Sequence, residues 1–153
     1  MSFIMWKEYL LSEKFVDELS EKLLKQKLKY IPDNSYSSTI NGRQTQNIVD
    51  LFSKGELRQM IPFDEFYDKI FYIHYIAYDH GGHQTIHHHA QTEKYSFILY
   101  LNNVDGDTCF LAPVFTTVEP QKGKVIIFDS RVQHFGAKSY KNKKILVGAI
   151  DKR

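Results

Sequence analysis

The chain has 153 residues, enough for one domain that buries most of its apolar surface without disulfide support. Its formal net charge of +2 gives no sign of a nucleic-acid partner, and no apolar run approaches the roughly 20 residues that a membrane span needs. The single cysteine, Cys109, excludes an internal disulfide, and the N-terminus lacks the basic start and small-residue cleavage site of a signal peptide. We therefore expect a protein of a reducing compartment, the cytoplasm.

The N-terminal part, residues 1–70, is expected to be a helical support for the rest of the chain. Residues 12–29 carry apolar side chains at helical spacing, with Ser12 as the N-cap, and predict an amphipathic helix. Residues 32–47 are polar and rich in turn formers, so we expect a loop there. Residues 48–70 predict short helices. The apolar stripe of the first helix consists of Phe15, Val16, Leu19, Leu23, Leu24 and Leu28.

From residue 71 onward the sequence changes to short β-type runs, separated by Gly, Pro, Asn and Asp. Aromatic residues make up 14% of the chain and pack well on pleated surfaces. Many short strands at regular spacing are typical of a sandwich or a barrel. We therefore predict a single domain, 1–153, in which an all-β core (71–153) follows the helices. The predicted strands are 70–78, 85–89, 95–101, 108–113, 114–120, 124–128 and 144–150, with a break at Gly81 and Gly82 between the first two.

Four of the seven histidines lie at positions 83, 87, 88 and 89. Side chains alternate between the two faces of a strand, so His87 and His89 would share a face and His88 would point the other way. Two imidazoles on one face can converge on a single ion, and imidazole suits Fe, Zn, Cu and Ni. A solvated polar tract is the alternative, but a triple histidine directly before a buried strand favours a metal. His134, the only histidine after this cluster, is the candidate third ligand.

The C-terminal half also contains five short motifs in a fixed order. They are Tyr78-x-x-Gly81 before His87; the strand Ser96–Asn102; the turn and strand Asp105–Phe110; Pro120-x-x-Gly123 with an apolar strand to Phe128; and His134, followed ten residues later by Lys144.

In this order the motifs resemble the Fe(II)/2-oxoglutarate-dependent oxygenases, especially their prolyl-hydroxylase-like branch. The resemblance implies a mainly β fold with N-terminal helices, the double-stranded β-helix or jelly roll. It also implies a non-haem Fe(II) enzyme of the hydroxylase type that uses 2-oxoglutarate and O2 on a substrate that the sequence does not identify. Carried over to this chain, the metal ligands and catalytic residues are His87, His89 and His134, and the residues expected to bind 2-oxoglutarate are Lys144, Tyr100 and Tyr78.

The sequence departs from that family at one metal ligand, because His89 stands where the family has the carboxylate of His-x-Asp. Three neutral imidazoles leave the same positions of an ion open but do not offset its charge. The stretch Gly81-x5-His87-x-His89-x3-Glu93 also resembles the first motif of the cupins, which share the double-stranded β-helix. A cupin-like metal-binding domain without 2-oxoglutarate chemistry is therefore the alternative function, with Glu93 as a possible further ligand.

A third interpretation shifts the frame by one residue. His88-x-Ala90 would resemble the His-x-Ala of the 2-oxoglutarate halogenases. The spacing from Tyr78 and Gly81 favours His87 instead, so we rank this interpretation third.

Overall fold

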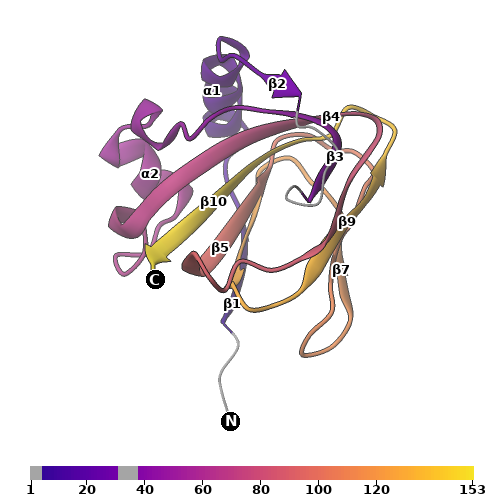
Figure 1. Ribbon diagram of the computed structural model, residues 1–153. Helices are drawn as coiled ribbons and strands as arrows, with labels where there is room; N and C mark the ends of the chain where they lie inside the picture. The colour runs from indigo at the N-terminus through magenta and orange to yellow at the C-terminus, as the bar shows by residue number, and fades with distance from the viewer. Residues whose placement is uncertain (1–4, 31–37) are drawn as a thin grey trace.

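Two α-helices brace a curled, ten-stranded antiparallel sheet in the computed structural model, which describes residues 5–30 and 38–153 (Figure 1). The strand order is β1-β8-β5-β10-β4-β9-β6-β7, and β3 joins β4 and β2 beside this path. This is the mainly β double-stranded β-helix with N-terminal helices that the sequence predicts. No helix in the described ranges is long and apolar enough to cross a membrane.

The elements have the following bounds. The helices are α1 (Glu13–Leu24) and α2 (Lys54–Met60), and the short 3-10 helices are η1 (Val49–Leu51) and η2 (Tyr67–Lys69). The strands are β1 (Trp6–Leu10), β2 (Lys29–Tyr30), β3 (Thr39–Gln44), β4 (Ile70–His87), β5 (Glu93–Tyr100), β6 (Thr108–Phe110), β7 (Thr116–Val118), β8 (Lys124–Asp129), β9 (His134–Ser139) and β10 (Lys144–Lys152).

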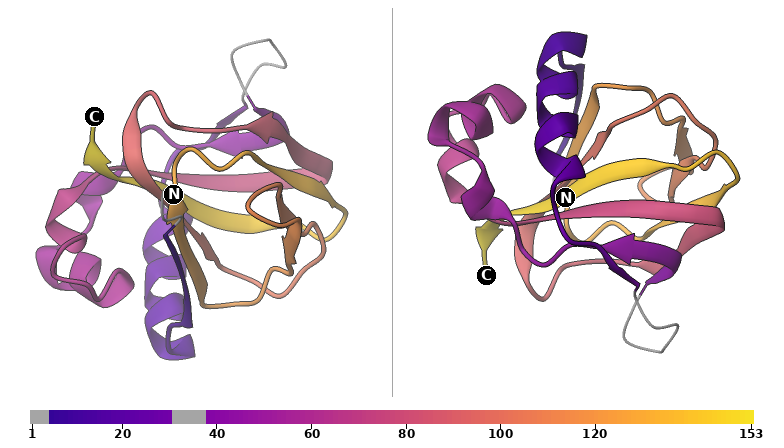
Figure 2. Two further views of the ribbon diagram at one scale, coloured as in Figure 1. Left: turned by 90° about the horizontal axis from the view of Figure 1, so that it is seen from below. Right: turned by 90° about the horizontal axis from the view of Figure 1, so that it is seen from above.

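Helix α1 begins where the sequence predicts. The Ser12 hydroxyl accepts a hydrogen bond from the backbone N–H of Phe15, which caps the helix start. Leu24 is 74% exposed and ends the helix, so the apolar stripe is shorter than predicted. Both helices lie on one side of the sheet, as the two views in Figure 2 show. The buried stripe of α1 and Met60 of α2 belong to the same apolar cluster there. The buried α1 residues are Phe15, Val16, Leu19 and Leu23.

The central strands are buried on both faces, which gives the protein two apolar clusters. Alternate residues such as Leu99 and Leu146 face the helices and form an outer core with α1. Their neighbours in sequence face the opposite way, into the barrel. The central strands therefore lack a polar face, as predicted for 95–101. The barrel interior contains Ile76, Tyr78, Ile98, Tyr100, Phe110, Val118, Ile126, Phe128, Val132 and Ile145.

The structure corrects the predicted loop at 32–47. Residues Thr39–Gln44 form strand β3, which pairs with β4, while residues 32–37 lie outside the described ranges. The N-terminal part also contributes β1, which pairs with β8, so it is more than a helical support.

The expected break at Gly81 and Gly82 is also absent. Strand β4 runs without interruption to His87, with register shifts against β9 between Gly82 and Gln84 and between Gln84 and His87. These irregularities let one long strand bend from one layer of the barrel to the other.

Candidate metal centre

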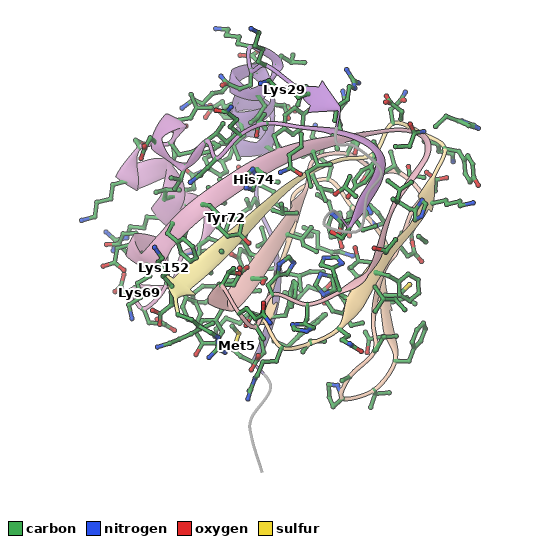
Figure 3. All side chains as sticks on the ribbon, in the orientation of Figure 1. Met5, Lys29, Lys69, Tyr72, His74 and Lys152 are labelled. Carbon is green, nitrogen blue, oxygen red and sulfur yellow. The ribbon has the colours of Figure 1, made fainter. Side chains whose placement is uncertain are left out.

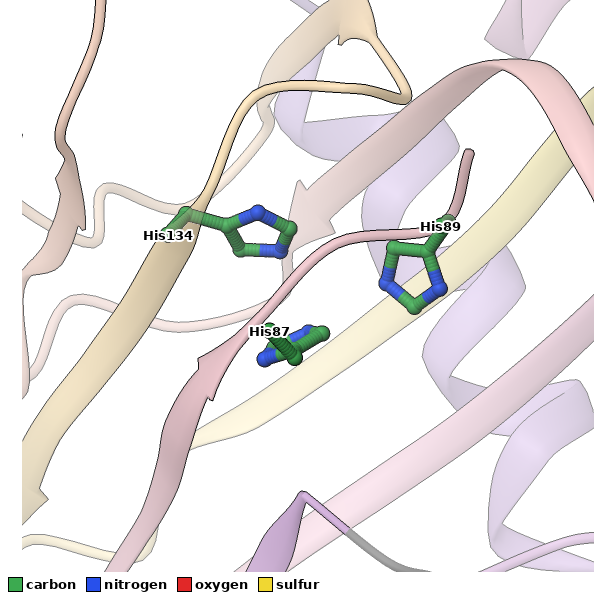
Figure 4. Close-up of side chains that lie close together, drawn as sticks. All are labelled: His87, His89 and His134. Carbon is green, nitrogen blue, oxygen red and sulfur yellow. The ribbon is translucent and has the colours of Figure 1, made fainter. Parts of the chain in front are cut away.

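Three histidines converge at one end of the barrel interior. His87 ends β4 and lies directly opposite His134, which begins β9, while His89 follows two residues after the strand end. The ring centroids of His87 lie 4.2 Å from His134 and 4.8 Å from His89. One ligand nitrogen from each of the three rings can be chosen so that all lie within 4.8 Å of one another, and Figure 4 shows the rings turned toward a common centre. Two nitrogens on one ion are at most about 4.2 Å apart, so small ring movements bring the three onto one metal.

Backbone carbonyls fix the orientation of two of these rings. The Nδ1 atom of His87 lies 2.6 Å from the carbonyl oxygen of Thr85, and that of His134 lies 3.0 Å from the carbonyl oxygen of Val132. A carbonyl can only accept, so each Nδ1 carries the hydrogen. The Nε2 atoms are left with free lone pairs, the form in which imidazole binds a metal.

Burial keeps these imidazoles neutral. It lowers the pKa of His87 and of His89 to about 4, and that of His134 to about 3. At neutral pH no proton competes with a metal ion for these nitrogens.

His88 lies outside the cluster. Its side chain is exposed, and its ring accepts a hydrogen bond from the backbone N–H of Ala90. The residues of the His87-x-His89 motif therefore converge with His134, whereas His88 of the alternative His88-x-Ala90 motif does not.

Beside the histidines lies a cavity of about 160 Å³ that also reaches Glu93. The Glu93 side chain is fully buried, and its carboxylate accepts hydrogen bonds from the hydroxyls of Tyr72 and Ser96, each at 2.8 Å, and from that of Thr92. Burial raises the pKa of Glu93, and the three hydroxyls act against that shift. Among the described residues, the group with ligand atoms close enough for one ion contains only the three histidines.

The lysine inside the barrel is Lys143, and this corrects the position that we predicted for Lys144. Lys143 is 3% exposed and shares a strand face with Ile145 of the barrel interior. Lys144 is half-buried and lies on the opposite face, with Leu146 of the outer core. The Lys143 ammonium donates to the carbonyl of Gly106 at 2.7 Å, and burial lowers its pKa to about 8.

Tyr78 and Tyr100 line the same end of the barrel as Lys143. The Lys143 ammonium lies 5.4 Å from the ring centre of Tyr78 and 5.9 Å from that of Tyr100. The Tyr100 hydroxyl donates to Thr108 at 2.6 Å. The Tyr78 hydroxyl is buried and makes no hydrogen bond of ordinary geometry within the described part of the chain, although the side chains of Gln84 and Thr39 lie near it. Tyr78 is thus the better candidate to donate to a ligand.

A short stretch of β9 connects the two ends of this interior. Gly136 lies two residues beyond His134 on the same face, a step of about 7 Å. A Cβ atom on Gly136 would lie 3.7 Å from the Lys143 ammonium, so the missing side chain leaves space between the lysine and the histidines. Lys143 does not itself line the 160 Å³ cavity, but Gln84 does, and the backbone N–H of Gln84 lies 3.5 Å from that same Cβ position.

Comparison with known proteins identifies the fold. No protein-family model and no curated protein matches the sequence. The chain is similar to the crystal structure of a prolyl-4-hydroxylase from Pseudomonas putida, with a TM-score of 0.74 and 18% identity over 97% of this chain and 92% of that one.

Two further structures are similar. One is a prolyl hydroxylase from Trichoplax adhaerens in complex with a peptide of hypoxia inducible factor (TM-score 0.68, 12% identity, 97% of this chain and 83% of that one). The other is HygX from Streptomyces hygroscopicus with nickel and 2-oxoglutarate bound (TM-score 0.68, 8% identity, 95% and 81%). The resemblance seen in the sequence is thus confirmed for the fold: the chain has the double-stranded β-helix of the 2-oxoglutarate oxygenases.

Proposed function

We propose that the protein is a non-haem Fe(II)- and 2-oxoglutarate-dependent oxygenase, of the hydroxylase type, that uses O2 to oxidise a second substrate. The observation that carries this proposal is a buried cation, Lys143, that makes no ion pair in the described part of the chain and lies in the same barrel interior as three neutral histidines. A metal site alone would not need Lys143.

Lys143 has the properties of an anchor for an anionic ligand. No ion pair within the described ranges includes it, and burying an ammonium without a contacting counter-ion is costly. The carboxylates of Asp107 and Asp105 lie beyond ion-pair distance and only partly offset the effect of burial on the Lys143 pKa. An ammonium has three N–H donors, and the carbonyl of Gly106 takes one of them. The others and the Tyr78 hydroxyl are free to donate to the carboxylate of 2-oxoglutarate that lies farthest from the metal.

The residues of the histidine cluster fit a metal ion. His87, His89 and His134 would hold Fe(II), which supplies the reaction with O2 when it is bound together with 2-oxoglutarate. Phe110 and Phe128 pack against the His134 ring at centroid distances of 5.5 and 5.0 Å, and keep water from that side of the site. Because three neutral ligands leave the charge of the ion uncompensated, we expect the dianionic 2-oxoglutarate to bind the metal-loaded protein much more tightly than the metal-free protein.

Calorimetric titration of 2-oxoglutarate into Mn(II)-loaded protein tests the proposal. Lys143→Met should weaken binding by ~2–5 kcal/mol, the scale for breaking a buried hydrogen-bonded charge pair. Lys144→Met is the matched control, because it removes the same charge one residue away on the outer face, and it should change the affinity little. Wild-type protein that binds no 2-oxoglutarate at millimolar concentration would rule out the oxygenase.

The alternative is a cupin-like metal-binding domain without 2-oxoglutarate chemistry. It is favoured by Glu93, a buried carboxylate in the same cavity as the three histidines. In that case the metal binds, the titration with 2-oxoglutarate gives no signal, and Glu93→Gln weakens metal binding as strongly as the loss of one histidine.

A further inference from the structure

The half of the cavity that lies away from Lys143 has its own polar wall. Tyr72 and His74 lie next to each other on the interior face of β4, with ring centroids 5.2 Å apart, and Figure 3 shows them side by side along that strand. Ser96 and Glu93, on β5, line the same cavity. We call these four residues the acceptor wall.

The hydroxyl hydrogens of this wall are already used in hydrogen bonds to Glu93. Tyr72 and Ser96 each donate to the Glu93 carboxylate at 2.8 Å. A hydroxyl has one proton to donate and two lone pairs that can accept. Toward the cavity, both oxygens can therefore act only as acceptors while they hold Glu93.

The ring of His74 has the same polarity. Its Nδ1 atom lies 3.1 Å from the carbonyl oxygen of Thr45, which can only accept, so Nδ1 carries the hydrogen. With Nδ1 donating, Nε2 is the ring nitrogen that is left to accept a hydrogen bond. Three neighbouring side chains of one wall thus present lone pairs and no donor.

The charge of the cavity points the same way. Among the residues that line it in the described part of the chain, Glu93 has the only formal charge, and there is no lysine or arginine. Lys143, the buried cation of the barrel interior, does not line this cavity. Within the cavity no cation of the described residues therefore faces Glu93, and a cationic group of a ligand can lie against it without repulsion.

From these observations we infer that the acceptor wall binds a cationic amine, namely an ammonium or guanidinium group of the substrate. Such a group donates N–H hydrogen bonds to Tyr72, Ser96 and His74, and its charge complements Glu93. The face of the Tyr72 ring favours the same cation. This inference names the substrate class and rests on the proposed function for the reaction at that site.

Four probes of equal chain length test the polarity of the wall: hexylammonium, hexylguanidinium, 1-hexanol and hexanoate. Their binding is measured by saturation-transfer NMR on protein loaded with Zn(II), a diamagnetic metal that imidazole binds, and 2-oxoglutarate, and again on the metal-free protein. We expect at least one of the two cations to bind about tenfold or more tightly than 1-hexanol, as for one charge-assisted hydrogen bond, and hexanoate to bind most weakly. The relative affinity of the two cations identifies the head group.

Two variants and one control assign the preference to the wall. Tyr72→Phe keeps the ring and loses the hydroxyl, and Glu93→Gln keeps the shape and loses the charge. In each variant, once thermal melting confirms that it is folded, the preference for the cation over 1-hexanol should fall several-fold. Tyr140→Phe removes a tyrosine hydroxyl outside the cavity lining and should leave the preference unchanged.

Equal or tighter binding of 1-hexanol or hexanoate, no binding of either cation at millimolar concentration, or an undiminished preference in both folded variants would overturn the inference. These outcomes are separate from a failure of the proposed function. If 2-oxoglutarate binds but the cations are not preferred, only the substrate class is wrong. If the cations are preferred by a protein that never binds 2-oxoglutarate, the amine site remains and the oxygenase does not.

Discussion

Each end of the barrel interior buries one charged side chain, and the two side chains differ in their hydrogen-bond partners. Glu93 is fully buried and accepts hydrogen bonds from three hydroxyls. Lys143 is almost as deeply buried, but its ammonium donates to one carbonyl, lies over two aromatic rings and makes no ion pair in the described part of the chain, because the carboxylates of Asp105 and Asp107 act on it only from a greater distance. The three hydroxyls hold the Glu93 carboxylate in place, and a carboxylate has no donor that could be left unpaired. The Lys143 ammonium keeps N–H donors without an acceptor among the described residues, which indicates that it receives an anionic ligand.

The neutral histidine cluster shares its cavity with Glu93, and its removal should have the largest effect. We expect His134→Ala to lower metal affinity by at least about 100-fold, because it removes a ligand and not only an outer partner. Metal content after equilibration with Fe(II) or Mn(II) is the measurement. His88→Ala, on the exposed neighbour of the cluster, should retain full metal content. Undiminished metal content in the His134 variant would refute the three-histidine site.

Replacing each buried charge by a neutral side chain should change stability in opposite directions. Lys143→Met should stabilise the ligand-free protein by ~1–4 kcal/mol, since an apolar side chain of similar length replaces a buried charge that makes no ion pair. Glu93→Gln should destabilise it by ~1–3 kcal/mol, since the amide NH2 that replaces one carboxylate oxygen cannot accept from the hydroxyls bound there. Urea denaturation of the metal-free proteins gives both values. A destabilised Lys143→Met variant would mean that this lysine has a structural partner.

The histidines should make stability depend on pH. Burial holds their pKa values at about 3 to 4, below the ordinary value of 6.5, so between these values the unfolded chain binds more protons than the folded one. The free energy of unfolding of the metal-free protein should therefore fall as the pH is lowered from about 6.5 to 4, and change little from this source above pH 7. Denaturation of wild type and of a His87→Gln, His89→Gln double variant at pH 7.5 and 5 isolates the effect. An equal loss in both proteins would exclude the histidines as its source.

The smallest effect is expected at Gly136, between the lysine and the histidines. The nearest atoms to an added Cβ lie at ordinary contact distances of 3.5 to 3.7 Å, so Gly136→Ala should change the free energy of unfolding by under ~1 kcal/mol. If 2-oxoglutarate spans this space, the same methyl group should weaken its binding by ~1 kcal/mol. Calorimetry gives the change in 2-oxoglutarate affinity, and denaturation of the same preparation gives the change in the free energy of unfolding. Unchanged 2-oxoglutarate affinity would indicate that the ligand does not pass Gly136.

Alternation in the predicted strand 85–89 was sufficient to choose His87 and His89 over His88, although the observed strand ends at His87 and His89 follows it. His88 sits between two histidines and is exposed, so the polar and buried faces separate as expected. Alternation failed for the lysine because β10 is buried on both faces. Ile145 faces the barrel and Leu146 faces the helices, and both are apolar, so the pattern does not tell which face a lysine before them takes.

Two other features could not be predicted from the sequence, each for a different reason. Strand β3 has a polar sequence, Thr39–Gln44, and is a strand because the long β4 offers it a backbone to pair with. The acceptor wall combines Tyr72 and His74 with Glu93, about twenty residues later, and only the pairing of β4 and β5 with β10 brings them to one cavity. Local patterns do not contain such long-range contacts.

The most direct test of the central claim is a crystal structure of the protein with Mn(II) and 2-oxoglutarate. We predict one ion bound by His87, His89 and His134, with the far carboxylate of 2-oxoglutarate against the Lys143 ammonium and the Tyr78 hydroxyl. An ion bound through His88, or 2-oxoglutarate that leaves Lys143 on the Gly106 carbonyl without a carboxylate partner, would contradict it.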